Sequence, residues 1–265
     1  MVAPAAPALA PTPPPAPEAP ATDPRPGAPD ARDVRPKSVV DLLTLHEDNY
    51  FITGFSKGTQ AKFQFSFKYE LWPNEGPHAV QFAYTQRSLW ALYDTSSPFV
   101  ETNYAPELFY TYYHRHERDA APGCGFFLER AGLQHESNGQ SEPLSRGWNR
   151  LYAETRFGCR DEGSRHLAAV RLRVWAPPIG TADNPAITRY LGYGELGISY
   201  GFDARSLGNL SLSAIGRKGT SRRLALGSLE FDLRWRPAYE SFLSGWRLTP
   251  HLYAQAYTGY GEMLV

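Results

Sequence analysis

The amino-acid sequence predicts an all-β protein, an antiparallel up-and-down β-barrel, and three observations support this. Long stretches alternate apolar and polar side chains, which is the period of a β-strand. Between them lie short segments rich in Gly, Pro, Asn and Asp, without a helical pattern. No run of about 18 apolar residues occurs, which excludes a transmembrane helix, and the mean hydropathy of the chain is −0.44. A transmembrane β-barrel remains allowed, because its alternating strands are polar on average.

Residues 1–37 form a Pro- and Ala-rich arm, which we expect to be disordered because it holds few large apolar side chains. The barrel domain should then occupy residues 38–265. An exported protein begins with a basic segment followed by an apolar one, whereas the first basic residue here is Arg25. We therefore expect that a signal peptide has been removed or that the start is misplaced.

Eleven strands are predicted after a lead-in at Ser38–Glu47, which could form one amphipathic turn. In the clearest, Ala61–Trp72, four aromatic residues and one leucine alternate with five polar residues. The others are Asn49–Ser56, His78–Tyr93, Glu101–His116, Gly123–Ser137, Trp148–Cys159, Leu167–Trp175, Thr188–Phe202, Leu207–Gly216, Arg223–Trp235 and Trp246–Thr258. Bacterial single-chain barrels have even strand numbers, so eleven strands would leave an open edge.

Charge and cysteine content narrow the range of partners. Lys plus Arg and Asp plus Glu both number 27, so no basic surface argues for a nucleic-acid partner. The two cysteines, Cys124 and Cys159, lie almost symmetrically about a turn at Gly139–Gly147. A disulfide across the hairpin, in an oxidising compartment, and two free thiols in the barrel wall both remain open.

The chain is organised around one hairpin, Gly132–Tyr152. If Gln134–Ser137 is extended, His135 and Ser137 share one face. The turn-forming residues that follow reverse the chain and bring Asn149 opposite His135. A nucleophile, a base and an orienting amide on one surface are the parts of a serine-hydrolase triad. The alternative is a hairpin whose Ser and Asn serve the turn and whose His lies at a membrane interface.

Three polar neighbours of this trio need a separate interpretation. Glu136 and Asn138 alternate with the catalytic pair, so we expect them to face the barrel interior and contribute to its polarity. Glu129 shares the face of His135, which is unusual for a lipid-facing strand. A β-bulge or a position near the headgroups would account for Glu129.

The run HESNGQSEPLSRGWNRLYAE resembles the active-site segment of the outer-membrane phospholipase A family. The resemblance lies in the order His-x-Ser-Asn-Gly and then Ser-Arg-x-Trp-Asn-Arg at this spacing. It runs from about Leu45 to the C-terminus and leaves out only the arm. Further stretches that agree are Asn49–Ile52, Phe63–Phe67, Ala83–Leu92, Ser96–Phe109, Asp183–Leu196 and Tyr257–Glu262.

The resemblance implies a twelve-stranded barrel of the bacterial outer membrane, of which we expect the last strand to be missing here. It also implies a calcium-dependent phospholipase that is activated by dimerisation. Such an enzyme hydrolyses acyl esters of phospholipids and lysophospholipids at the A1 and A2 positions. The implied triad is Ser137 as nucleophile, His135 as base and Asn149 as orienter.

The resemblance further implies a Ca²⁺ site formed where two barrels meet. Its ligands would be the Gln140 carbonyl, the Ser145 hydroxyl and Ser96 from a second copy of the chain. The Gly139 N–H would donate to the oxyanion, and Gln86 would lie at the dimer interface.

Two other functions remain as alternatives. One is an outer-membrane barrel or pore that keeps the hairpin without activity, which a missing strand would favour. The other is a different surface serine esterase, such as a lipid A deacylase. The Asn149 position and the Ser96–Phe109 segment favour the phospholipase over this esterase.

Overall fold

The computed structural model divides the chain into two units, Met1–Pro36 and Lys37–Val265. All the residues it describes belong to the second unit: 42–56, 59–72, 76–114, 122–161, 166–176, 179, 182–203, 207–222, 226–237 and 251–264. The predicted arm at 1–37 lies outside the described residues and stays a prediction. The beginning of the lead-in, 38–41, and parts of predicted strands at 115–116, 223–225 and 246–250 also lie outside them.

The described residues form twelve strands and one helix. The elements are β1 (Leu43–Leu45), β2 (Tyr50–Ser56), β3 (Thr59–Glu70), β4 (His78–Trp90), β5 (Phe99–Tyr113), β6 (Gly123–Ser137), β7 (Gly147–Arg160), β8 (His166–Trp175), α2 (Ile187–Leu191), β9 (Gly194–Asp203), β10 (Asn209–Lys218), β11 (Gly227–Arg236) and β12 (Leu252–Gly259). Each of the eleven predicted strands therefore has a counterpart.

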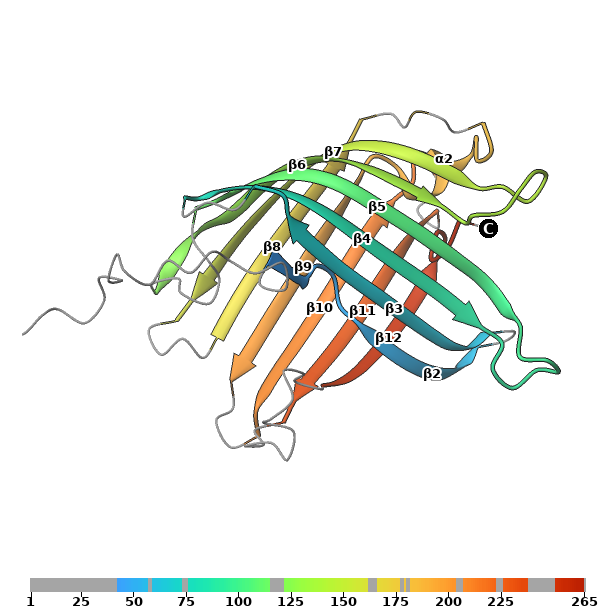
Figure 1. Cartoon of the computed structure of the whole chain (residues 1–265). Helices are drawn as coiled ribbons and strands as arrows, with labels where there is room; N and C mark the ends of the chain where they lie inside the picture. The colour runs from blue at the N-terminus through green and yellow to red at the C-terminus, as the bar shows by residue number, and fades with distance from the viewer. Residues whose placement is uncertain are drawn as a thin grey trace, which may run out of the picture. The chain divides into compact units, whose positions relative to one another are not determined.

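The strands form one antiparallel sheet in the order β1-β3-β4-β5-β6-β7-β8-β9-β10-β11-β12, with β2 also paired to β3. Figure 1 shows the long strands side by side in a curved sheet. This confirms the predicted all-β, up-and-down fold. Within the lead-in, Leu43–Leu45 forms β1, which pairs with β3. The predicted amphipathic turn falls largely on 38–41, outside the described residues, and stays a prediction. Along the described residues no ladder joins β12 to β2, although the rings of Tyr50 and Tyr253 stack with centroids 4.5 Å apart.

The predicted strand Thr188–Phe202 is wrong in its first part. Helix α2 occupies Ile187–Leu191, and β9 begins only at Gly194. The two buried ends of the helix, Ile187 and Leu191, lie one turn apart and belong to the same buried cluster as Trp175. Gly192 follows with φ of 65°, a left-handed conformation that ends the helix.

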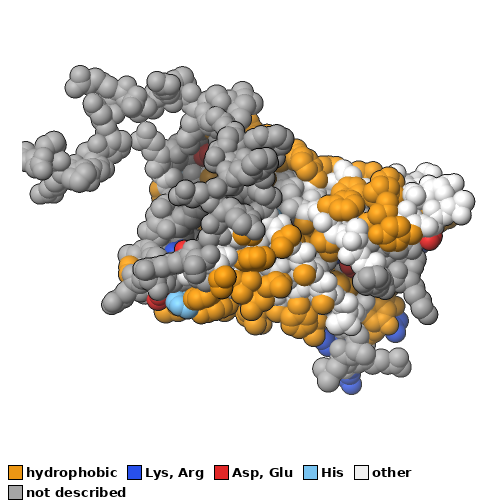
Figure 2. All heavy atoms as spheres, turned by 90° about the horizontal axis from the view of Figure 1, so that it is seen from below, with side chains coloured by type: hydrophobic (Ala, Val, Ile, Leu, Met, Phe, Trp, Pro, Cys, Tyr) orange, Lys and Arg blue, Asp and Glu red, His pale blue; other side chains and the backbone are white. Residues whose placement is uncertain are grey.

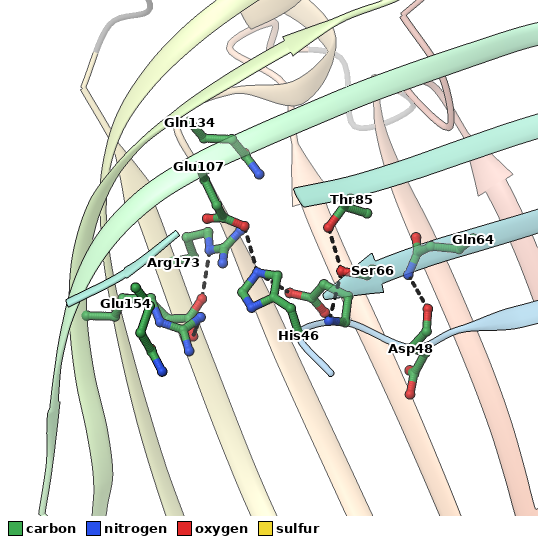
Figure 3. Close-up of polar contacts among 12 residues, drawn as sticks. His46, Asp48, Gln64, Ser66, Thr85, Glu107, Gln134, Glu154 and Arg173 are labelled. Carbon is green, nitrogen blue, oxygen red and sulfur yellow. Dashed lines mark hydrogen bonds and ion pairs between the residues drawn. The ribbon is translucent and has the colours of Figure 1, made fainter. Parts of the chain in front are cut away.

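The two faces of the sheet differ in polarity. The inner face surrounds a cavity of about 1490 Å³ lined by many charged side chains. Figure 3 shows part of this interior, where His46 bonds Glu107 at 2.6 Å and Arg173 bonds Glu154 at 2.7 Å. On the outer face Leu133 stays 59% exposed, and Figure 2 shows hydrophobic side chains spread over the barrel surface. Apolar outside and polar inside is the pattern of a barrel surrounded by lipid.

Among the described residues no helix has the length and apolar character needed to cross a membrane.

The two cysteines form a disulfide. Cys124 and Cys159 are directly opposite each other in the β6–β7 ladder, with Cα atoms 4.0 Å apart. The sequence had left this pairing open, and the strand register decides it. The bond joins the end of the hairpin that lies away from the 138–146 loop.

Candidate active site

The β6–β7 hairpin brings the predicted trio together on the outer wall. Its register pairs His135 with Asn149 and Ser137 with Gly147. The alternating neighbours Gln134 and Glu136 line the interior cavity, so His135 and Ser137 point outward. The predicted reversal of the chain between residues 138 and 146 is therefore the feature that assembles this surface.

The His135 ring is oriented by an amide. His135 Nδ1 lies 2.8 Å from Asn149 Oδ1, and Asn149 Nδ2 donates to the Ile179 carbonyl at 3.1 Å. Because Asn149 Oδ1 can only accept, the ring proton belongs on Nδ1. The lone pair then lies on Nε2, which is the nitrogen that can take a proton from a neighbouring hydroxyl.

Ser137 is half-buried and open to an incoming ligand. Its hydroxyl makes no hydrogen bond to any described residue, His135 included. A short nucleophile–base bond is often absent before substrate binds. A Cβ at Gly147 would lie 3.5 Å from the Ser137 Cβ, which is an ordinary van der Waals contact.

Gly139 follows the nucleophile in a conformation that suits glycine. Its φ is 65°, and a Cβ there would lie 2.8 Å from Cε2 of Tyr104. Tyr104 is also the partner of Ser137 in the β5–β6 ladder. The Gly139 N–H has no partner among the described residues, so it can donate to a ligand.

The loop after Ser137 is held from inside by Asn138. Asn138 Oδ1 accepts from the backbone N–H of Gln140 at 3.3 Å and of Arg146 at 2.9 Å. Its Nδ2 donates to the Leu144 carbonyl at 2.9 Å. Asn138 therefore has a role in the loop beyond the predicted contribution to interior polarity, because a turn with these backbone groups needs a local side-chain partner.

The residues predicted to bind calcium would do so through oxygen atoms, and they lie in two loops. The Ser145 hydroxyl donates to Asp183 Oδ2 at 2.5 Å, which adds a carboxylate beside it. Ser96, in the β4–β5 turn, has a φ of 65°, a conformation that few residues other than glycine adopt. Hydroxyl, carbonyl and carboxylate oxygens suit Ca²⁺. The described residues contain no group of three His, Cys, Asp or Glu side chains that could hold a metal.

Comparison with known proteins identifies the family. A family model described as Phospholipase A1 matches residues 42–265. The chain belongs to the phospholipase A1 family. Phospholipase A1 of Escherichia coli K12 is 38% identical over 214 residues, which cover 78% of this chain and 64% of that protein. Phospholipase A1 of Klebsiella pneumoniae is 34% identical, over 78% of this chain and 65% of its own. The chain thus spans less than two thirds of these curated relatives.

Solved structures of phospholipase A relatives have the same fold. Outer membrane phospholipase A from Escherichia coli aligns with a TM-score of 0.59 at 34% identity, over 77% of this chain and 71% of that chain. An outer membrane phospholipase from Salmonella typhi, a dimer with bound calcium, aligns with a TM-score of 0.58 at 35% identity, over 77% and 72%. These relatives, together with the apolar outer face and polar inner face of the sheet, confirm that this family member is a bacterial outer-membrane β-barrel protein.

The strand register also places two residues beside Ser137, and the sequence analysis did not predict that they lie together. One ladder row contains Gln86 of β4, Tyr104 of β5 and Ser137 of β6. Gln86 was a predicted interface residue, whereas Tyr104 and Asp183 were missed. Both missed residues lie in stretches that carry the family resemblance, Ser96–Phe109 and Asp183–Leu196.

The two glutamates of β6 lie on opposite faces. Glu136 faces inward as predicted and accepts from Arg150 at 2.9 Å and from Trp148 at 3.1 Å. Glu129 lies outward and pairs with His114, 3.5 Å away. The β6 bulge lies between Phe126 and Leu128, so it does not separate Glu129 from the face of His135.

Proposed function

We propose that this protein hydrolyses acyl ester bonds of phospholipids and lysophospholipids at the outer wall of the barrel. The observation that carries the proposal is the His135–Asn149 hydrogen bond of 2.8 Å, with Ser137 two residues along the same outward face. Membership of the phospholipase A1 family supports the same chemistry. The substrate then reaches the site from the lipid layer itself.

The reaction follows from the orientation of the imidazole. His135 Nε2 takes the Ser137 proton while Oγ bonds to the ester carbonyl carbon. The tetrahedral centre collapses, the bond to the glycerol oxygen breaks, and His135 returns the proton to that oxygen. Water then attacks the acyl-serine by the same steps and releases the fatty acid. The Gly139 N–H is the donor available for the negative oxygen of the tetrahedral centre.

Asn149 serves as the positioning residue for His135. A carboxylate in this place would support a protonated imidazole more strongly, but a bare charge on a lipid-facing wall is costly. The amide keeps the ring in one tautomer through its bond to Nδ1, and Ile179 keeps the amide in place. The triad therefore functions without an additional charge in the membrane.

Calcium and a second copy of the chain complete the proposed site. The Gln140 carbonyl and the Ser145 hydroxyl of one copy would hold Ca²⁺ together with Ser96 of the other, and Asp183 lies beside Ser145. When bound, the ion supplies positive charge that favours a developing oxyanion. Gln86, on the outward row of Ser137, is the polar residue we assign to the dimer interface.

The test is fatty-acid release by the protein refolded in detergent micelles, with calcium and with a chelator, beside Ser137→Ala. Release that needs both calcium and Ser137 supports the whole proposal. If release does not need calcium but is abolished by Ser137→Ala, the proposed hydrolase is supported and the proposed metal site is contradicted. Release from lipid A but not from phospholipid would favour the deacylase. A folded barrel that releases nothing would leave a barrel without catalytic function.

A further inference from the structure

Three histidines lie at one rim of the barrel, at the opposite end of the strands from the proposed active site. His78 begins β4, His114 directly follows β5, and His166 begins β8. Consecutive strands are antiparallel, so these three positions fall at the same end of the sheet. The 138–146 loop follows β6 and lies at the other end. These three residues are called the histidine rim below.

Two members of the histidine rim face outward around one tyrosine. Tyr112 shares the parity of Tyr104, which lies beside Ser137 on the outer face. His78 is the ladder partner of Tyr112, and His114 lies two residues beyond it. The Tyr112 ring centroid is 5.2 Å from that of His78 and 4.8 Å from that of His114. Both imidazoles therefore pack against the same outward ring.

The third member, His166, faces outward beside two aromatic residues of β9. The outward row of Tyr112 continues through β6 and β7 to Leu172 of β8, and His166 lies six residues before Leu172. His166 Nδ1 bonds the Tyr200 hydroxyl at 2.5 Å, and its ring centroid is 4.9 Å from that of Phe202. No described residue bonds Nε2 of His166, so this nitrogen is available to a ligand.

The depth of the histidine rim matches the membrane. His114 follows Tyr104, the ladder partner of Ser137, by ten positions. At about 3.4 Å per residue this is about 34 Å along the strand, and a tilt of about 45° converts it to about 24 Å of depth. The apolar band of a membrane barrel is about 25 Å tall. If Ser137 lies at the headgroups of one surface, the histidine rim lies at the headgroups of the other.

Histidine is the source of positive charge on this part of the outer wall. In the described strands β4–β9, no outward position holds Lys or Arg. Two carboxylates face the rim: Glu129 lies 3.5 Å from His114, and Asp161 accepts from the His166 backbone N–H at 2.8 Å. The remaining ionisable groups that face it are phenols, Tyr110, Tyr112 and Tyr200.

The sign of the charge on the rim therefore depends on pH. Histidine is the side chain whose charge ordinarily changes between pH 5 and pH 8. With three neutral imidazoles, the described groups carry the two negative charges of Glu129 and Asp161. With three protonated imidazoles, three positive charges exceed these two. Anionic headgroups are repelled in the first state and attracted in the second.

We propose that the histidine rim binds phosphate groups of anionic phospholipids at the membrane surface opposite the proposed active site, and that it does so only at acidic pH. The partner is lipid because the rim lies on the outer wall at headgroup depth, between aromatic rings. Imidazoles have apolar faces and polar edges, which suits this boundary. The inference is independent of ester hydrolysis at Ser137.

The test measures the preference of the barrel for phosphatidylglycerol over phosphatidylcholine. Spin-labelled dialkyl lipids in dialkyl phosphatidylcholine vesicles, with a chelator present, distinguish lipid that touches the protein from bulk lipid by electron spin resonance. Dialkyl lipids contain no ester, so they are not substrates. We expect the preference to be about twofold higher at pH 5.5 than at pH 8, because a contact worth about fivefold per charge is averaged over all lipids around the barrel.

A triple variant isolates the histidine rim. His78→Gln, His114→Gln and His166→Gln together should abolish this pH dependence, since glutamine does not ionise but still bonds a tyrosine hydroxyl. The matched control is His251→Gln. His251 precedes β12 at the same end of the sheet but lines the interior cavity, so its replacement should leave the pH dependence unchanged.

Two results would overturn the proposal. One is an equal preference at pH 5.5 and pH 8 in the unaltered protein, and the other is a pH dependence that survives in the triple variant. Should the triple variant not fold, Glu129→Gln provides a second test. Loss of this carboxylate should raise the preference for phosphatidylglycerol at pH 8, and an unchanged preference would equally contradict the proposal.

Discussion

Two histidines on the two faces of the sheet show how position decides the role of one side chain. His46 lies inside, with Nε2 bonded to Glu107 at 2.6 Å and the ring stacked on Phe109. His135 lies outside, with Nδ1 bonded to Asn149 at 2.8 Å, and no described residue bonds its Nε2. The inner imidazole has its place in a network of structural bonds. The outer one keeps a nitrogen available for proton transfer.

The same contrast extends to the rest of the polar residues. Inside, charges are paired, as in Glu154 with Arg173 and Glu195 with Arg217 at 2.8 Å. An unpaired charge is costly when it is buried, so the paired charged residues of the inner face are interpreted as stabilising the fold. Outside, polar side chains that meet lipid are costly, which supports the proposed catalytic role of Ser137, His135 and Asn149.

Removal of the nucleophile should have the largest effect. Ser137→Ala should lower kcat/KM for phospholipid by about 10³-fold or more, because the step that forms the acyl-serine is lost. Its unfolding midpoint in denaturant should match that of the unaltered protein, since the hydroxyl makes no hydrogen bond to any described residue. Substantial residual release with this variant would assign the nucleophile elsewhere.

Loss of an inner carboxylate should act on stability instead. Glu107 accepts from His46 and, at 2.6 Å, from Tyr152, so Glu107→Ala leaves two buried donors unpaired. We expect the free energy of unfolding in micelles to fall by about 3 kcal/mol, with kcat unchanged at temperatures where the barrel is folded. The outward Leu212→Ala is the control, with a change below about 1 kcal/mol. Similar losses for both variants would remove the contrast between the faces.

Asn149 allows the contrast to be tested within the catalytic trio. Asn149→Ala should lower kcat about 10²-fold, because His135 loses the partner that sets its tautomer. KM should change little, since the amide contacts the base and not the lipid. Asn149→Asp should restore much of the rate. A rise in KM alone would make Asn149 a binding residue.

The smallest expected effect concerns the loop. Asn138→Ala leaves two backbone N–H groups and one carbonyl without their partner, which costs about 1–3 kcal/mol locally. We expect the calcium concentration for half-maximal activity to rise several-fold, since Gln140 and Ser145 lie in this loop. An unchanged calcium dependence would show that the loop conformation held by Asn138 does not affect calcium binding.

Much of the fold could be predicted because β-strands repeat every two residues. All eleven predicted strands have counterparts, and the hairpin that pairs His135 with Asn149 follows from its turn formers. Helix α2 was missed because a single turn leaves too few residues to establish a helical period, and its packing against Trp175 is a tertiary contact. The loop role of Asn138 was not predicted, because parity alone does not reveal that its bonds go to the loop.

Spacing within a few neighbouring residues was enough to predict the alternation of faces and the order of the proposed catalytic trio. Motifs spread from about Leu45 to the C-terminus carried the resemblance to the outer-membrane family. The tertiary structure alone decided the Cys124–Cys159 bond, the Asp183 contact with Ser145 and the row that joins Gln86, Tyr104 and Ser137. Each of these depends on how one strand or loop is aligned with another. Strand register is fixed by hydrogen bonds between segments distant in sequence.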